Sequence, residues 1–214
     1  MPTSNYSRRK FMNISAATVA TTLLPTVTIA DTAKPTAKQT EGPFFPKHKQ
    51  IDKNANMTQI EGLDGHANGE VISISGKVVD TDGNPVKGAV LNIWQADKNG
   101  RYMHEDAPET SPLDPNFQYW AILKSADDGS YKLKTIKPGK YAVTEEGDWE
   151  RPPHIHFRVA RKGMRELTTQ MYFANEPLNE IDKLYLEAPE NERSSIVVDF
   201  KSGHGQFDIV LAKV

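Results

Sequence analysis

The chain has 214 residues, a formal net charge of −2, 37% hydrophobic residues and no cysteine. This length allows a buried core without disulfide bonds or a structural zinc site. The near-neutral charge gives no electrostatic footprint for nucleic acid, and no run of about 18 apolar residues free of breakers indicates a permanent membrane span. We therefore expect one globular domain that acts on a small molecule.

Residues 1–30 have the order typical of a twin-arginine export signal. Arg8 and Arg9 stand in SRRKFMN, which is followed by ISAATVATTLLPTVTIA, an uncharged stretch rich in Thr and Ala. A basic region before such a stretch predicts a signal peptide cleaved near Ala30, and hence a periplasmic or secreted protein. A disordered basic tail is the alternative. Because this export route carries folded proteins, it suits a chain that acquires a cofactor in the cytoplasm.

Residues 31–40, DTAKPTAKQT, are polar and lack periodicity, which predicts a linker before a domain at 41–214. Beyond residue 70, short stretches rich in Val, Ile, Tyr and Phe are separated by Asp-Gly, Asn-Gly and Pro-Gly pairs, a pattern typical of strands joined by tight turns. The expected strands lie within 71–80, 89–97, 130–136, 140–145, 154–160, 168–173, 194–200 and 205–214.

These short strands predict an all-β fold, a β-sandwich of mostly antiparallel strands with long loops and one short helix. The best helix candidate is PLNEIDKLYLE at 177–187, in which Leu178, Ile181 and Leu184 fall on one face. The turn at Asp82 and Gly83 supports the architecture but says little about chemistry, because many sandwich domains carry such corners.

The stretch RPPHIHF places two histidines one residue apart. In an extended strand His154 and His156 share one face, while Ile155 and Phe157 take the face that belongs to the core. Two imidazoles about 7 Å apart along a strand can bind one metal ion if they face a cavity. A polar outer face of the sheet explains the pattern as well, and the stretch has no neighbouring carboxylate to complete a two-histidine, one-carboxylate iron site.

Several further segments share their order with one enzyme family. They are TEGPFF at 40–45, GKVVDTDGNPVKGAVLNIWQAD at 76–97, NGRYMHED at 99–106, DPNF at 114–117, DGSYKLKTIKPGKY at 128–141, RPPHIHF at 151–157 and TQMYF at 169–173. Together they resemble an intradiol ring-cleaving dioxygenase of the protocatechuate 3,4-dioxygenase β-subunit type. Several blocks in a fixed order are more specific than any one of them.

The resemblance implies a ferric ion, Fe(III), held by four side chains and a hydroxide. Position by position, the two tyrosinate ligands fall on Tyr102 and Tyr141, and the histidine ligands on His154 and His156. Two phenolates and a hydroxide balance the three charges of Fe(III), so that the buried site would be neutral. A free tyrosine titrates near 10, so the metal itself must displace the phenolic protons.

The family's reaction, carried over to these positions, inserts both atoms of O2 into a catechol-type diol and gives a cis,cis-muconate-type diacid. The resemblance makes Tyr141 the ligand that the diol displaces and that takes a proton. It makes Arg151 the cation that stabilises developing negative charge, and Gln170 a second pocket residue acting with it.

Two departures from the family pattern affect the pocket. Val143 stands where an aromatic residue is common, and QYWAILKSADD at 118–128 replaces a Gly-rich loop. Catechol, hydroxyquinol, protocatechuate and larger diols all remain open as substrates, as does assembly into homo- or hetero-oligomers. The rival interpretations are a non-catalytic, transthyretin-like binding module and a copper or zinc site built on the same histidines.

Overall fold

The computed structural model describes residues 33–47, 50, 52–143 and 149–214, so the expected export signal lies outside the described residues. The strands are β1 (Val71–Asp80), β2 (Val90–Trp94), β3 (Trp120–Lys124), β4 (Ser130–Ile136), β5 (Tyr141–Ala142), β6 (Glu150–Arg151), β7 (His154–Ala160), β8 (Leu167–Phe173), β9 (Val197–Val198), β10 (His204–Gln206) and β11 (Ile209–Leu211). The helical elements are the 3-10 helices η1 (Pro177–Glu180) and η2 (Glu190–Ser195) and the α-helix α1 (Lys183–Glu187).

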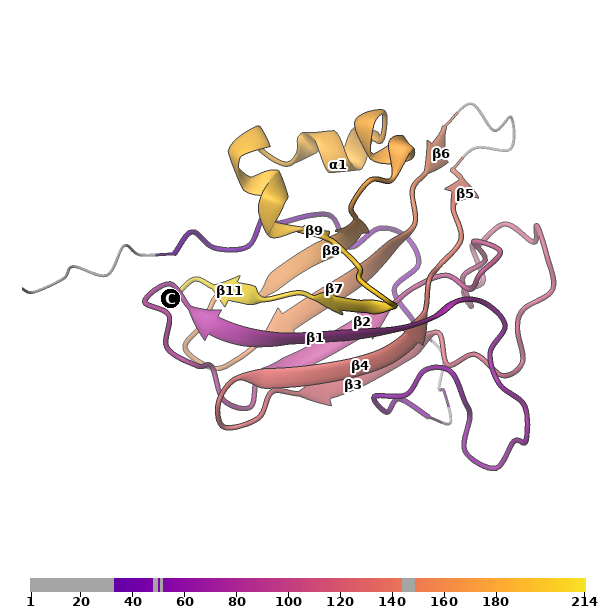
Figure 1. The fold of residues 1–214 in the computed structure, drawn as a ribbon, viewed down its shortest axis with the longest axis horizontal. Coiled ribbons are helices and arrows are strands. Elements are labelled where there is room, and N and C mark those ends of the chain that lie inside the picture. The colour runs from indigo at the N-terminus through magenta and orange to yellow at the C-terminus, as the bar shows by residue number, and fades with distance from the viewer. Residues whose placement is uncertain (1–32, 48–49, 51, 144–148) are drawn as a thin grey trace, which may run out of the picture. The chain divides into compact units, whose positions relative to one another are not determined.

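Two sheets make up the sandwich, as predicted (Figure 1). In the first, β1 pairs antiparallel with β4 along one edge and parallel with β10 and β11 along the other. In the second, the strand order is β3-β2-β7-β8-β9, with β7 in the centre. The central position of β7 matters because it carries the two histidines.

The core lies between the sheets and follows the period-two alternation of the strands. Ile72 and Ile74 of β1 pack in one buried cluster with Leu91 of β2 and Ile155 and Phe157 of β7. Alternate residues of a strand point to opposite faces, so this packing turns His154 and His156 away from the core cluster. The predicted division of β7 into a core face and a histidine face is confirmed.

Strand β3 is absent from the sequence prediction, which treats 118–128 as a loop. Trp120–Lys124 pairs antiparallel with β2, from Val90 opposite Lys124 to Trp94 opposite Trp120. The stretch WAILK has no strict alternation, and its burial is mixed as well. Pairing with β2 thus fixes a strand that local sequence alone does not indicate.

The predicted helix at 177–187 is also wrong in part, because it divides into η1 and α1. Asp182 has extended backbone angles and its carboxylate accepts a hydrogen bond from the backbone N–H of Tyr185, which caps α1. A capping residue with these angles ends the preceding turn and starts a new helix. As a result Ile181, expected on the apolar face, is 65% exposed.

Residues 33–40, which the composition favours as a linker, are hydrogen-bonded to the domain. The backbone N–H groups of Ala33, Thr36 and Gln39 donate to carbonyl oxygens of Thr81, Val210 and Thr168. Ala37 is buried, and its carbonyl accepts from the Thr169 hydroxyl at 2.7 Å. This segment leads directly into residues 40–45 over the histidine face of β7.

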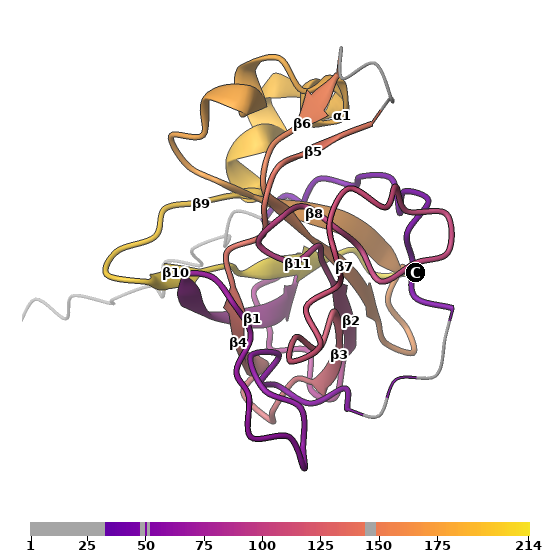
Figure 2. The ribbon, with the colours of Figure 1, turned by 90° about the vertical axis from the view of Figure 1, so that its right-hand side faces the viewer.

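The helical elements lie beside the β5–β6 pair in both views (Figures 1 and 2). Residues of β6 contact η1, and Tyr185 of α1 stacks edge-on against Tyr172 of β8 at 5.0 Å between ring centroids. The helical segment therefore borders the end of the second sheet where the histidines lie. Within the described residues, no helix is long and apolar enough to cross a membrane.

Candidate active site

Three of the sequence-predicted ligands meet in the structure. The Tyr102 hydroxyl lies 3.1 Å from Nε2 of His154 and 3.1 Å from Nε2 of His156, and all three side chains are buried. Tyr141 completes the group, because its ring centroid is 5.6 Å from that of Tyr102 and 5.8 Å from that of His154. Two phenols and two imidazoles thus surround one small volume.

The histidines are held by their neighbours in the second sheet. His156 stands opposite Trp94 of β2, and the two rings stack at 4.8 Å with planes 10° apart. His154 Nδ1 lies 2.7 Å from the carbonyl oxygen of Pro152. Because a carbonyl only accepts, Nδ1 carries the proton, and His154 Nε2 keeps its lone pair toward Tyr102.

Tyr102 lies in a loop and Tyr141 begins β5, and the two segments approach each other closely at glycines. Gly100, at φ +81°, precedes Tyr102 by two residues, and a Cβ there would overlap the carbonyl oxygen of Lys140. Gly139, two residues before Tyr141, donates its N–H to the carbonyl oxygen of Asp97 at 2.8 Å. The Asn-Gly and Pro-Gly pairs of the sequence are therefore what brings the two phenols together.

The polar atoms of this group point at one centre. The single phenolic proton of Tyr102 serves one of the two Nε2 atoms that face it, and Nη1 of Arg151 lies 3.2 Å from Nε2 of His154. Nδ1 of His156 is buried and finds no hydrogen-bond partner among the described residues. Nδ1 of His156 cannot bind the same ion as Nε2 of its ring, so the fit to a metal rests on the other donors: two Nε2 atoms and a phenol oxygen directed at one point are ligands that suit a bound metal ion.

Burial sets the protonation of the four candidate ligands. It lowers the pKa of His154 and His156 well below the ordinary histidine value, and nearby Arg151 lowers both further. It raises the pKa of Tyr102 and Tyr141, although Arg151 acts in the opposite direction on each. The imidazoles are thus neutral and able to coordinate, whereas the phenols ionise only beside a strong cation.

Arg151, also predicted from the sequence, is buried beside the histidines. Its Nη1 lies 3.2 Å from Nε2 of His154, and its Nη2 donates to Oε1 of Gln170 at 2.9 Å. Gln170, the other predicted residue, donates from Nε2 to the carbonyl oxygen of Thr40. The structure therefore brings the four candidate ligands together with Arg151 beside them, and Gln170 joins this group through its hydrogen bond with Arg151.

Two functional partners were missed by the sequence reasoning. Asp182 accepts from Nε and Nη2 of Arg151 at 3.1 and 3.0 Å, and the hydroxyl of Tyr172 accepts from Nη2 at 2.9 Å. The Tyr172 hydroxyl donates in turn to Gln39 Oε1 at 3.0 Å. Asp182 lies in the expected helix, where the sequence does not distinguish it from the other polar residues.

A pocket of about 440 Å³ adjoins the four rings. It lies among the 40–45 segment, the β5–β6 pair and α1. Its lining includes Tyr141 and Arg151 but neither histidine, and Tyr141 is less buried than Tyr102. The lining residues are Thr40, Gly42, Pro43, Phe44, Asp106, Pro108, Tyr141, Ala142, Val143, Trp149, Arg151 and Leu184.

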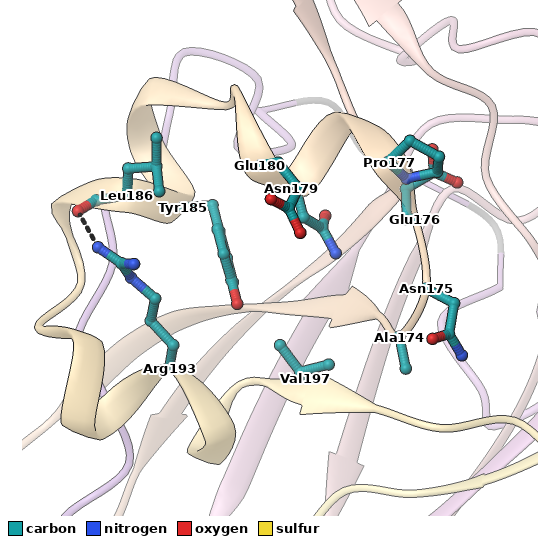
Figure 3. A pocket seen from close by; sticks show the side chains of 10 residues that line it. All are labelled: Ala174, Asn175, Glu176, Pro177, Asn179, Glu180, Tyr185, Leu186, Arg193 and Val197. Atoms are coloured by element: carbon teal, nitrogen blue, oxygen red, sulfur yellow. Dashed lines mark hydrogen bonds between the residues drawn. The ribbon is translucent and has the colours of Figure 1, made fainter.

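A second pocket, of about 570 Å³, lies among η1, α1, η2 and β9 and contains none of the six predicted residues (Figure 3). Arg193 donates from Nη2 to the carbonyl oxygen of Leu186 at 2.9 Å, which joins η2 to α1. Tyr185 points from α1 toward the strands (Figure 3). Its ring lies edge-on to that of Tyr172. This pocket therefore lies outside the candidate centre and is linked to Arg151 through Tyr185 and Tyr172.

Comparisons with known proteins agree on one group of relatives. A family model described as Dioxygenase matches residues 40–211. The protocatechuate 3,4-dioxygenase beta chain of Burkholderia cepacia is 37% identical over 166 residues, which cover 73% of this chain and 70% of the relative. Catechol 1,2-dioxygenase of Candida albicans is 28% identical, over 81% of this chain and 55% of the relative. The chain spans about half the length of that enzyme.

Solved structures show the same likeness. The dioxygenase domain of a dioxygenase carbohydrate-binding protein fusion from Streptomyces sp. SirexAA-E is 28% identical, with a TM-score of 0.62 over 85% of this chain and 100% of that one. The 3-chlorocatechol 1,2-dioxygenase of Rhodococcus opacus 1CP gives a TM-score of 0.67 over 86% of this chain and 75% of that one. At 23% identity the second match supports the fold alone.

Proposed function

Because the chain belongs to the intradiol dioxygenase family, we propose that it is a non-haem Fe(III) enzyme that opens the ring of a catechol-type diol. Both atoms of O2 would enter the product, a cis,cis-muconate-type diacid. The domain at 41–214 would carry this activity. The observation that supports the proposal most strongly is the convergence of two phenols and two imidazoles on one buried centre.

The proposed ligands are Tyr102, Tyr141, His154 and His156. Hard phenolate oxygens favour a ferric ion, and two of them with a hydroxide would offset its charge in a buried setting. When bound, the ion would accept both oxygens of the diol as ligands and draw electron density from it, which would prepare the ring for reaction with O2. Copper or zinc would bind the imidazoles but would be stabilised less than Fe(III) by two phenolate ligands.

The two tyrosines differ in burial, which supports different roles. Tyr102 is 3% exposed and does not line the pocket, so it suits a permanent ligand. Tyr141 lines the pocket and is only half-buried. A diol that enters beside it can hand a proton to its phenolate oxygen, so Tyr141 is the proposed base.

Arg151 is the proposed electrostatic stabiliser. Its guanidinium is fixed by Asp182, Tyr172 and Gln170 while Nη1 points to the candidate ligands. Negative charge that develops on the ring would meet a cation already in place, with no reorganisation at the moment of reaction. The ion pair raises the pKa of Arg151, since its bonds to Asp182 outweigh burial, so the group stays charged.

Oxygen uptake by purified, iron-loaded protein tests the proposal directly. We expect uptake with catechol-type diols, cleavage between the two hydroxyl-bearing carbons, and a visible band from tyrosinate-to-Fe(III) charge transfer. Colourless protein that binds iron without consuming oxygen would contradict it. A product cut beside the hydroxyls would contradict the intradiol assignment while leaving the metal site in place.

We also propose that the chain is exported through its twin-arginine sequence and acts in the periplasm or outside the cell. The support is the sequence pattern at residues 1–30. Assembly with itself or with a related subunit remains part of the proposal, since one relative is named as the beta chain of an enzyme.

A further inference from the structure

The pocket beside Tyr141 has an uneven distribution of charge and apolar surface. Most of its walls are apolar side chains: Pro43, Phe44, Pro108, Val143, Trp149 and Leu184. Among the described residues that line it, the charged ones are Asp106 and Arg151. The pocket thus offers an acidic group and one cation to any molecule that enters.

Most hydrogen-bond donors of the Arg151 guanidinium are already used within the protein. Arg151 is 2% exposed and gives both Nε and Nη2 to the carboxylate of Asp182, which is itself fully buried. Its remaining bonds go to Gln170, Tyr172 and His154. Nε and Nη2 are therefore taken, and the remaining Nη1 faces the candidate ligands. A carboxylate on the substrate ring, away from that centre, would have to lose its water without a cationic partner, which is costly.

Two lysines that contact lining residues do not supply a substitute. Lys47 lies 3.7 Å from Asp106, and Lys183 stacks on the ring of Trp149 at 4.8 Å. Neither lines the pocket. Each lysine is thus already engaged, Lys47 with the carboxylate of Asp106 and Lys183 with the ring of Trp149. We therefore do not expect either ammonium group to bind an incoming anion.

On these grounds we propose that the pocket selects diols with an uncharged, apolar ring substituent and disfavours diols that carry a carboxylate. The inference rests on the proposed function, because it places the diol at Tyr141 and Arg151. A volume of about 440 Å³ leaves room for such a substituent, since pockets for small molecules start at about 300 Å³. The walls formed by Val143, Trp149 and Leu184 would gain from burying it.

The test uses anaerobic binding to the iron-loaded full chain, with turnover measured separately. The probes are catechol, 4-methylcatechol, 4-ethylcatechol and 3,4-dihydroxybenzoate. We expect each added methylene to tighten binding by up to about fourfold, and the carboxylate to weaken it at least about tenfold relative to 4-methylcatechol. Equal or tighter binding of 3,4-dihydroxybenzoate would overturn the inference.

Matched variants sharpen the result. Val143→Lys adds a cation to the wall and should narrow or reverse the preference against the carboxylate, whereas Leu63→Lys adds the same charge at an exposed site outside the pocket. An unchanged preference in Val143→Lys would also overturn the inference. Weaker binding of the carboxylated diol after Lys47→Ala or Lys183→Ala would do so too, because it would show that a rim cation receives the anion.

The two proposals fail in different ways. If diols bind in the predicted order but no variant or condition gives oxygen uptake, the dioxygenase function fails while the pocket preference stands. If oxygen uptake is greatest with 3,4-dihydroxybenzoate and its binding is tightest, the function stands and the pocket preference fails.

Discussion

Asp182 holds the guanidinium of Arg151 through two hydrogen bonds, and both side chains are buried. The same carboxylate caps α1 and accepts a hydrogen bond from Nε1 of Trp149 at 3.3 Å. One residue therefore joins the proposed electrostatic group to two walls of the pocket, since Trp149 and Leu184 of α1 both line it. A buried pair of this kind orients a side chain even where its net contribution to stability is small.

Replacing Asp182 with Asn should leave the Arg151 charge without a counterion. We expect the free energy of unfolding to fall by about 3–5 kcal/mol, the typical cost of breaking a buried pair from one side. We also expect kcat/KM in oxygen uptake to fall at least about tenfold, because the guanidinium loses its fixed orientation. Urea unfolding and oxygen-electrode kinetics measure the two effects.

Asp127→Asn is the matched control, because it removes an ion pair with Lys87 whose partners are both largely exposed. An exposed pair contributes little to stability, and this one lies outside the pocket. Wild-type kinetics in Asp182→Asn would contradict the assigned role of the buried pair.

Removing either histidine should remove the metal. His154→Ala and His156→Ala each delete one imidazole from the centre beside Tyr102, and we expect iron content after purification to fall to a small fraction of the wild-type value.

Tyr141→Phe should keep some iron and slow diol binding, since Tyr141 lies at the pocket wall. Metal analysis by mass spectrometry decides, and full iron content in both histidine variants would reject the ligand set.

His66→Ala is a suitable control for general effects of histidine loss, because His66 is not among the groups around the candidate centre. We expect its iron content and visible absorption to match the wild type. A loss of metal in this variant would mean that the readout reports folding rather than ligation.

The acid limit of stability should depend on Asp80, the last residue of β1. Burial opposes ionisation of this carboxylate, but hydrogen bonds from Asn84 and Asp82 and the contact with Lys213 outweigh it and lower the pKa of Asp80 to about 2. A folded-state pKa below the unfolded value means that the stabilisation is present above about pH 4 and is lost as the pH falls toward 2.

Asp80→Asn should therefore destabilise the protein at pH 7 more than at pH 3. Thermal unfolding at several pH values checks this, with the wild type losing the Asp80 contribution over the acid range and the variant showing a flatter profile. An equal loss of stability at both pH values would show that the carboxylate charge is not what matters at this turn.

The sequence predicts the site better than it predicts the surrounding walls. Strand alternation predicts that His154 and His156 share a face, whereas their role as ligands, like that of Tyr102 and Tyr141, is implied by the family resemblance, which is carried by blocks of residues close in the chain. Asp182 could not be found in this way, because it meets Arg151 across 31 positions through a capping turn that only the folded chain forms.

In the fold too, elements defined by local sequence are predicted, whereas elements that depend on residues distant in the chain are not. Strands β1, β4 and β7 have bounds that match the alternating stretches of the sequence. The short strand β3 depends on its neighbour β2 for pairing, and the break in the helix depends on one carboxylate at Asp182. Elements whose stability comes mainly from tertiary partners carry little signal of their own.

Export can be tested independently of catalysis. If residues 1–30 act as a twin-arginine signal, replacing Arg8 and Arg9 with Lys should keep the protein in the cytoplasm, whereas the wild type should be found outside it. N-terminal sequencing of the exported protein should begin near Asp31. A mature chain that begins at Met1 or Pro2 would contradict the prediction.

Substitutions at two glycines with nearly equal φ angles can distinguish the cost of a left-handed backbone from the cost of a steric clash between segments. Gly100 has φ +81° and Gly83 has φ +80°, but a Cβ at Gly100 would overlap the carbonyl oxygen of Lys140, whereas a Cβ at Gly83 would meet nothing within 4 Å. Gly83→Ala should cost only the left-handed backbone penalty of about 1–2 kcal/mol. Gly100→Ala should cost more and force the segments carrying Tyr102 and Tyr141 apart.

Gly100→Ala should reduce both the iron content and the intensity of the tyrosinate absorption band. Gly83→Ala should leave the absorbance per bound iron unchanged even where it lowers the melting temperature. Iron analysis and visible spectroscopy of the two folded variants provide the comparison. If Gly100→Ala retains the full band, the close approach of the two segments does not position the phenols, and the tyrosines must be held by the aromatic packing around Phe44 instead.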